Sequence, residues 1–361
     1  VVPDTMKSVL CEVPNISVAR NLGIANAAGE VVAFIDDDAV PEPTWLTYLC
    51  EPFLDPNTAA SGGFVIGRNG ISFQWKARMA FPDGSAVPME VDPEKPTVLT
   101  GEPGRAIKTE GTNMAFRRAR LVALGGFDPA FAFYLDETDV NMRLAREGAR
   151  IAIVPMAQVH HGFAASERRT ATRVPRDLSS IGQSLRAFVQ KHDPKADLGA
   201  IFRAERDSQR RRLVRHMRDG NLMPGGVGRI LRSFDQGWQD DASPPKEISD
   251  FTNTPVFKPF GPHFSDEPTL VLTGRFWQAK RIHAQALAVV AKKRRVTVLL
   301  FSFSSIYHRV YFDPVGYWIQ RGGQFGRSAR NGRFLQLWRA KSRFRHEVAR
   351  NSDIRKVTRS K

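Results

Sequence analysis

A short apolar run that ends in three consecutive carboxylates is the feature that most constrains the fold of this chain. The run Val31–Ile35 is β-branched and aromatic, so it predicts a strand buried on both faces, as in parallel sheets covered by helices. Asp36, Asp37 and Asp38 follow at once. Ligands of open α/β sheets lie beyond the carboxyl ends of strands, and carboxylate oxygens suit Mg²⁺ or Mn²⁺. The pattern predicts a metal-binding edge, with a solvated acidic turn as the alternative.

The residues on both sides of this run predict helices. Upstream, Ser17 can cap a helix that carries an apolar face and stops at Gly29. Arg20 lies near the start of that helix, where a guanidinium can meet phosphate. Downstream, the proline-rich residues 39–46 open a second helix.

The stretch at residues 17–46, SVARNLGIANAAGEVVAFIDDDAVPEPTWL, resembles the nucleotide-sugar-binding centre of family 2 glycosyltransferases with the GT-A fold. In that family the acidic triplet is the DxD motif, which holds the divalent metal that bridges the diphosphate of the donor. The resemblance implies Mg or Mn as cofactor, with Asp38 and Asp36 as metal ligands. It also implies donor-binding roles for Arg20, Asn21, Asp36 and Asp37.

A second signature, at residues 111–144, resembles the family stretch in which a carboxylate at a helix start is the catalytic base. It includes GTNMAFRR, GGFD and the run FYLDETDVNMRL. The resemblance implies donor-binding roles for Gly111 and Asn113, and catalytic roles for Asp136 and Glu137. The two acid types stand in swapped order relative to the family, which leaves open which of the two removes the proton.

Inverting transfer needs a base for the acceptor hydroxyl, and crowded carboxylates raise one another's pKa. Asp136, Glu137 and Asp139 fall on one helical turn, so we expect such repulsion there. The structural alternative makes Asp136 a helix cap and pairs Asp139 with Arg143. We assign the chemical role to Glu137 and the structural role to Asp139.

A pair of histidines follows the strand expected at residues 151–154. The segment QVHHGFAAS resembles a family segment whose histidine reaches back to the metal or the diphosphate, and His161 aligns best with it. A hydrogen-bonded loop is the alternative for His160 and His161.

The resemblance covers residues 11–190. Family members begin with a strand, a helix and a second strand whose carboxylate recognises the base, and residues 1–14 can supply only the end of such a unit. The sequence therefore predicts an N-terminally truncated chain that lacks part of its nucleotide pocket, or a natural truncation that has lost activity.

The chain carries a formal charge of +16, concentrated at residues 203–218 and in the tail 327–361. Such stretches attract polyanions, although no nucleic-acid fold signature accompanies them. Around residues 334–345, apolar residues stand next to arginines in a mildly amphipathic pattern, which fits a helix lying on an anionic membrane. We expect peripheral contact with an anionic membrane and no specific nucleic acid; a solvated helix face is the structural alternative.

Two cysteines, Cys11 and Cys50, fit a reducing compartment, and no apolar run approaches the ~20 residues that span a membrane. The expected location is the cytoplasm, at the inner face of the membrane. Three regions are expected: a GT-A-like core over 1–165, a mainly parallel sheet flanked by helices; a basic helical extension and linker over 166–245; and a second small α/β unit with a basic tail over 246–361. In the last unit we expect strands at 269–272 and 296–302 around a helix at 278–292.

Two functional hypotheses follow. The first is a metal-dependent inverting glycosyltransferase that moves a sugar from a nucleotide-sugar donor to a glycan or lipid-linked acceptor, in bacterial polysaccharide biosynthesis at the cell envelope. The second is a catalytically disabled GT-A-like binding or scaffold protein, or a basic polyanion-binding protein. Intact acids at 36–38 and 136–139 favour the first, and the missing first strand favours the second.

Overall fold

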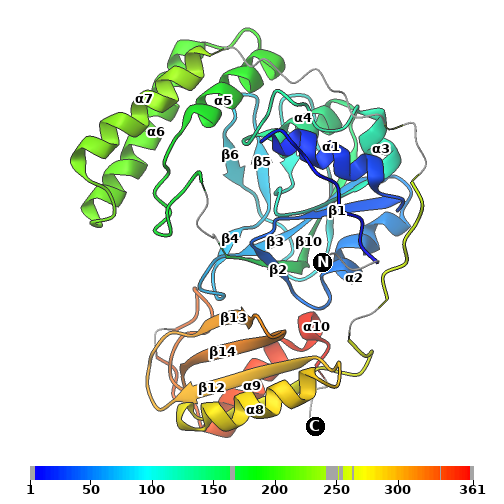
Figure 1. Ribbon diagram of the computed structural model, residues 1–361, viewed down its shortest axis with the longest axis vertical. Helices are drawn as coiled ribbons and strands as arrows, with labels where there is room; N and C mark the ends of the chain where they lie inside the picture. Colours follow the sequence, from blue (N-terminus) through cyan, green and yellow to red (C-terminus); the bar gives the residue numbers. More distant parts are fainter. Residues whose placement is uncertain are drawn as a thin grey trace.

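The computed structural model describes residues 5–162, 167–240, 251, 255–261, 264–333 and 335–357. A central sheet with helices on its faces forms the first part of the chain. Three further helices lie to one side of it, and a second sheet with its own helices lies below (Figure 1). The α/β class, with a second α/β unit, is as predicted.

The central sheet has its main strands in the order β1-β9-β3-β10-β2. Their bounds are β1 Val31–Ile35, β9 Asn113–Arg117, β3 Thr58–Ile66, β10 Arg150–His161 and β2 Ala39–Pro41, while β4 Phe73–Trp75 and β7 Thr97–Thr100 pair with β3 and β10. Strands β1, β3 and β10 run in the same direction, and β9 lies antiparallel between β1 and β3. The carboxyl ends of β1 and β10 therefore lie at one edge of the sheet.

Strand β1 covers the predicted residues, but its burial differs from the prediction. Among the described residues β1 pairs with β9 alone and ends the strand order. Only Val32 is buried, and Ile35 is exposed. An end strand has one neighbour, so burial on both faces was the wrong expectation.

Helix α1, Ile16–Asn26, precedes β1, and its cap differs from the prediction. Asn15 is the N-cap, and its side-chain oxygen accepts a hydrogen bond from the Val18 amide at 3.1 Å. Ser17 instead donates its hydroxyl to the Phe131 carbonyl at 2.7 Å. The Ser17 hydroxyl, which the local pattern assigned to the cap, thus bonds to a residue distant in sequence. The helix also ends at Asn26, before Gly29.

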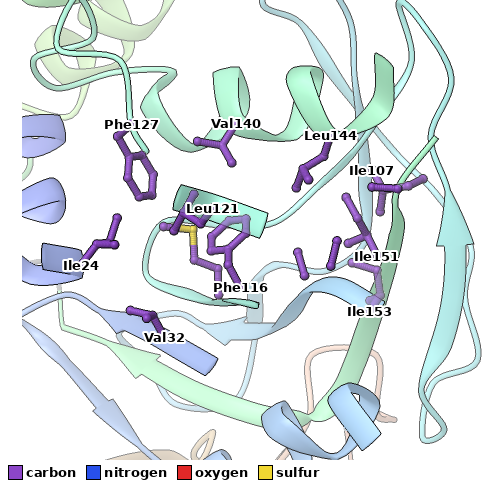
Figure 2. Close-up of a cluster of buried hydrophobic side chains, with 14 of the residues drawn as sticks. Ile24, Val32, Ile107, Phe116, Leu121, Phe127, Val140, Leu144, Ile151 and Ile153 are labelled. Atoms are coloured by element: carbon purple, nitrogen blue, oxygen red, sulfur yellow. The ribbon is translucent and has the colours of Figure 1, made fainter. Parts of the chain in front are cut away.

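The remaining helices of the core are α2 Trp45–Cys50, the 3₁₀ turn η1 Glu51–Leu54, α3 Arg118–Ala123 and α4 Asp136–Arg146. Helices α1, α3 and α4 cover one face of the sheet through a cluster that includes Ile24, Phe116, Phe127, Val140 and Leu144 (Figure 2). Helix α2 covers the other face with Trp45 and Leu49. This packing fixes the start of α4 relative to the strand ends.

Three helices form the extension beyond the core: α5 Ser179–His192, α6 Leu198–Arg218 and α7 Pro224–Gln239. A small sheet consists of β5 Arg78–Ala80, β6 Ala86–Pro88 and β8 Ala106–Lys108, and its residues Ala80 and Ala106 share an apolar cluster with α5. Phe131 and Leu135 of the core pack with Leu185 and Phe188 of α5. The expected helical region is therefore attached to the core by a shared apolar cluster.

The second unit has a four-stranded sheet in the order β11-β12-β14-β13. Its elements are β11 Leu270–Gly274, η2 Phe276–Gln278, α8 Ala279–Val290, β12 Val296–Ser302, β13 Arg309–Asp313, β14 Tyr317–Gly323, α9 Ala340–Arg350 and α10 Ser352–Arg355. Strands β11, β12 and β14 are parallel. The predicted strand–helix–strand order is confirmed.

The amphipathic helix expected over 334–345 is wrong. Helix α9 begins at Ala340, and Arg343 is fully buried, 3.1 Å from Glu347. A sequence pattern cannot tell a solvated arginine from one that pairs inside a fold. Phe334, the predicted boundary at 165–166 and most of the predicted linker at 240–245 lie outside the described residues.

None of the helices in the described part of the chain combines the length and the apolar character that crossing a bilayer requires.

Candidate active site

The acidic triplet forms a tight turn that joins β1 to β2. The Ala39 amide donates to the Asp36 carbonyl at 3.1 Å, which closes a four-residue turn. The following strand pairs with the end of β10, with Ala39 opposite His161 and Val40 opposite His160. The turn and the two histidines therefore meet at one sheet edge, where the sequence predicted a ligand.

Asp36, Asp38 and His161 form a cluster of possible metal ligands, with one ligand atom from each lying within 4.8 Å of the others. His161 Nε2 is 3.0 Å from Asp38 Oδ1. Its Nδ1 is 3.3 Å from Gln74 Oε1 on β4. Burial lowers the pKa of His161 despite the two aspartates, which favours the neutral ring that can bind a metal. Two hard oxygens and one imidazole fit Mn²⁺ or Mg²⁺.

The two histidines are not in a loop. Strand β10 continues from the predicted residues to His161, with a register shift between Val154 and Gln158. Pro155, which cannot donate a ladder hydrogen bond, lies within this irregularity. Because the register shifts there, the alternation of residues along the strand is interrupted. The sequence therefore predicted the end of the strand too early.

Further groups hold the carboxylates of the cluster. Thr112 Oγ1 donates to Asp36 Oδ2 at 2.5 Å, and Arg169 NH2 lies 2.8 Å from Asp38 Oδ2. Arg20 NH2 lies 4.0 Å from Asp36 Oδ1. Sequence reasoning missed Thr112 and Arg169. Thr112 stands between the predicted Gly111 and Asn113, so its place in that motif was an available signal, whereas Arg169 had only its charge.

The helix that carries the predicted base begins after a residue in the left-handed region. Leu135 has φ 64°, and Asp136 is the first residue of α4, so Asp136 is not the N-cap. Asp136 accepts a hydrogen bond from Arg20, and Glu137 accepts one from Lys108. Asp139 pairs with Arg143. Each acid has its own cation, so the expected mutual repulsion among the three carboxylates is wrong.

The pairing decides the protonation of Glu137. Burial alone would raise its pKa, but the charge and hydrogen bond of Lys108, with Arg20 further away, bring the pKa below the ordinary value. Glu137 is therefore ionised at neutral pH, the state that a base requires. Sequence reasoning missed Lys108, which ends β8 and lies 29 positions from its partner.

Asp139 is a structural centre. It is fully buried, and its carboxylate lies 2.8 Å from Arg143 NH2, 2.7 Å from Lys191 Nζ and 2.9 Å from His192 Nε2. Arg143 also donates to the Leu124 and Gly126 carbonyls at 2.7 Å each. The acid thus joins α4 to α5 and to the turn before Phe127.

A cleft of about 1240 Å³ runs along this edge of the core. The predicted residues that line it are Arg20, Asp36, Asp37, Asp38, Gly111, Asp136, Glu137 and His161. A Cβ at Gly111 would lie 2.7 Å from Arg20 NH2, so a larger residue there would require the end of the arginine to shift. The lining also includes Leu178, which precedes α5, Ile181 on α5 and Arg212 on α6.

Two predicted donor-binding residues are buried elsewhere. Asn21 donates its amide to the Phe127 carbonyl at 2.7 Å and accepts from the Phe127 amide at 2.8 Å. Asn113 accepts from the Trp45 indole at 2.8 Å and donates to the Ala157 carbonyl at 2.8 Å. Both side chains join segments of the core, and neither belongs to the lining of the cleft.

The central sheet has an acidic turn at its edge and a helix that begins with carboxylates beside it. This arrangement places the first part of the chain in the class of GT-A-like α/β proteins. Residues 12–121 match the family described as Glycosyl transferase family 2. This part of the chain is therefore similar to family 2 glycosyltransferases.

Relatives agree with this assignment. A glucosyl-dolichyl phosphate glucuronosyltransferase of Haloferax volcanii is 30% identical over 162 residues, 40% of this chain and 47% of the relative. A pre-mycofactocin glycosyltransferase of Mycobacterium tuberculosis is 28% identical over 149 residues, 40% of this chain and 29% of the relative. The matches thus cover less than half the length of these relatives.

Proposed function

We propose that this chain is a metal-dependent, inverting glycosyltransferase. It would move a sugar from a nucleotide-sugar donor to a glycan or lipid-linked acceptor. The observation that carries the proposal is the convergence of Asp36, Asp38 and His161 in a cleft that Glu137 also lines. The cluster of Asp36, Asp38 and His161 suits a metal ion with a diphosphate, and Glu137 suits an attacking hydroxyl.

The donor end of the proposed site is the acidic turn. Asp38, Asp36 and His161 would hold Mg²⁺ or Mn²⁺, which when bound neutralises the charge that develops on a diphosphate leaving group. Asp36 keeps its orientation through Thr112, and Asp38 through Arg169. Arg20, Asp37 and Gly111 line the adjacent cleft, where donor phosphates and sugar would lie.

The acceptor end is the start of α4. Glu137 would remove the proton from the acceptor hydroxyl as its oxygen attacks the anomeric carbon. Lys108 keeps Glu137 ionised, and its ammonium group donates hydrogen bonds to both Glu137 and the Thr138 hydroxyl. Asp136, paired with Arg20, connects the base to the donor side of the cleft. Positioned general bases contribute roughly 10²–10⁴ in rate.

The acceptor class rests on a likeness to relatives. The Haloferax relative is named for a lipid-linked acceptor, glucosyl-dolichyl phosphate. Ile181 on α5 is a half-buried apolar side chain in the lining of the cleft, where such an acceptor could pack. We extend this to peripheral contact with an anionic membrane, because Leu335 and Leu337 are exposed in the arginine-rich segment before α9.

The direct test is release of nucleoside diphosphate from a panel of nucleotide-sugars with Mn²⁺, with and without EDTA. Asp38→Ala should remove the metal-dependent part of the activity. The rival function is a donor-binding or scaffold protein without catalysis. It predicts metal-dependent nucleotide binding with no turnover at all, even with lipid-linked acceptors present.

A further inference from the structure

The turn that carries the acidic triplet depends on a very short strand. Strand β2 has three residues and ends the strand order of the central sheet, as far as the described residues extend. On one side it pairs with β10, and the Gly162 amide donates to the Asp38 carbonyl at 2.7 Å. A strand of this length has little stability of its own. The position of Asp38 therefore depends on what holds the other end of β2.

Glu42 follows β2 directly, and the second unit holds it. Arg355, at the end of α10, donates from Nε to Glu42 Oε2 at 2.8 Å and from NH2 to Oε1 at 2.7 Å. Both side chains are almost fully buried, at 2% and 1% exposure. A buried, two-bond arginine–carboxylate pair fixes direction as well as distance.

The same contact reaches the strand that carries the histidine ligand. His160 Nε2 lies 2.9 Å from Glu42 Oε1, and the His160 ring centre lies 4.4 Å from that of Trp318 on β14. The Arg355 guanidinium lies 4.8 Å from the same Trp318 ring. The second unit therefore contacts Glu42, directly after β2 and four residues after Asp38, and His160 on β10, one residue before His161.

A further hydrogen bond places α10 against the core. Thr44 Oγ1 donates to the Ile354 carbonyl at 2.8 Å. Figure 1 shows α10 between the central sheet and the sheet of the second unit. The contact therefore includes backbone as well as side chains, which limits how far β2 can move while α10 is docked.

We propose that the second α/β unit is a positioning element for the metal site, in which Arg355 acts through Glu42 and β2 to hold Asp38 opposite His161. The inference rests on the proposed metal-binding function of Asp36, Asp38 and His161. Without Arg355, the buried Glu42 carboxylate keeps His160 as a partner but loses its two-bond contact with α10, which is a costly loss for a buried charge. The residue after β2 is then held less firmly, and Asp38 loses its fixed distance from His161.

The test measures binding of Mn²⁺ alone to the whole chain, from the electron paramagnetic resonance signal of free Mn²⁺. Arg355→Met should weaken binding about tenfold, the lower end of what loss of an outer-shell partner costs a metal site. Glu42→Gln should give a similar loss, and the double variant should lose little more. Arg355→Lys should restore part of the affinity, since it keeps the charge without the paired geometry.

Arg343 provides a matched control. It is equally buried in the second unit, pairs with Glu347 at 3.1 Å and donates to the Gly326 carbonyl at 2.9 Å, both within that unit. Arg343→Met should leave Mn²⁺ affinity unchanged. An equal loss in this variant would overturn the proposal, because general destabilisation of the unit would then explain the effect.

The remaining outcomes separate this inference from the proposed function. If the parent chain binds Mn²⁺ through Asp38 and a folded Arg355→Met variant binds Mn²⁺ as tightly, the positioning role of Arg355 is overturned and the metal site is not. A parent chain with no Mn²⁺ binding, or with binding that survives Asp38→Asn, overturns the proposed metal site and this inference with it. If Arg355→Met does not fold by circular dichroism, Arg355→Lys and Glu42→Gln carry the same comparison.

Discussion

Replacing Asp139 by asparagine should destabilise the core without directly altering the cleft. Burial acts to raise the pKa of Asp139, but the hydrogen bond from His192 and the charges of Arg143 and Lys191 lower it from 3.8 to about 2. That difference corresponds to roughly 2–3 kcal/mol of stabilisation at neutral pH. Breaking a buried pair by removing one partner costs about 3–5 kcal/mol. We therefore expect a loss of at least about 2 kcal/mol.

The assay is equilibrium urea unfolding, followed by circular dichroism. At pH 7 the midpoint should fall while the slope stays constant, since the surface exposed on unfolding does not change. A carboxyl group with a depressed folded pKa stabilises above its unfolded pKa, and loses this effect as the pH falls through the folded pKa. The difference between parent and variant should therefore shrink between pH 4 and pH 2.

Glu147→Gln is the control, because Glu147 lies just after α4 and its ion pair with Arg120 is exposed. Exposed pairs contribute about 0–1 kcal/mol, so this variant should unfold close to the parent. A loss below about 1 kcal/mol for Asp139→Asn at pH 7, or a larger loss that stays constant down to pH 3, would refute the assigned role.

Three further predictions concern the site and the membrane. Glu137→Gln keeps the shape of the base, so turnover should fall roughly 10²–10⁴-fold while donor binding persists; near-normal turnover beside an inactive Asp136→Asn would move the base to Asp136. Lys108→Met should raise the pKa of Glu137 and shift the acidic limb of the kcat/KM profile to higher pH, whereas an unmoved limb would remove Glu137 from that step. Co-sedimentation with anionic liposomes should fall as salt rises and drop with Leu337→Ser, and equal pelleting with neutral liposomes would argue against membrane contact.

Continuous patterns of apolar residues made much of the fold predictable. The strand Val31–Ile35 and the strand Val296–Ser302 occur as expected, because each is a short apolar run with clear ends. The start of α4 was predictable because acids gather at its first turn. The place of the acidic turn at the sheet edge was predictable because it follows directly on a strand whose carboxyl end lies there.

The partners of these residues were not predictable, because they are distant in sequence. Arg169 stands 131 positions from Asp38, and no local pattern connects them. Lys108 reverses the expected direction of the pKa of Glu137, since crowding of acids is visible in sequence but the buried cation is not. Ser17 was a good local cap, and a distant carbonyl took its hydroxyl. The sequence thus indicated which residues lie close together. Their pKa values and their hydrogen-bond partners depend on tertiary contacts that the sequence does not show.

The ion pair of Glu42 with Arg355 has a consequence for the order of assembly. Its two residues stand 313 positions apart in the chain. Domains fold as units during synthesis, at about 5–20 residues per second, so roughly 15–60 s separate the appearance of the two side chains. Once β10 has been made, the acidic turn has that strand as a neighbour but still lacks its contact with Arg355. The edge of the first domain that carries the acidic turn is therefore completed only after α10 of the second unit has been made.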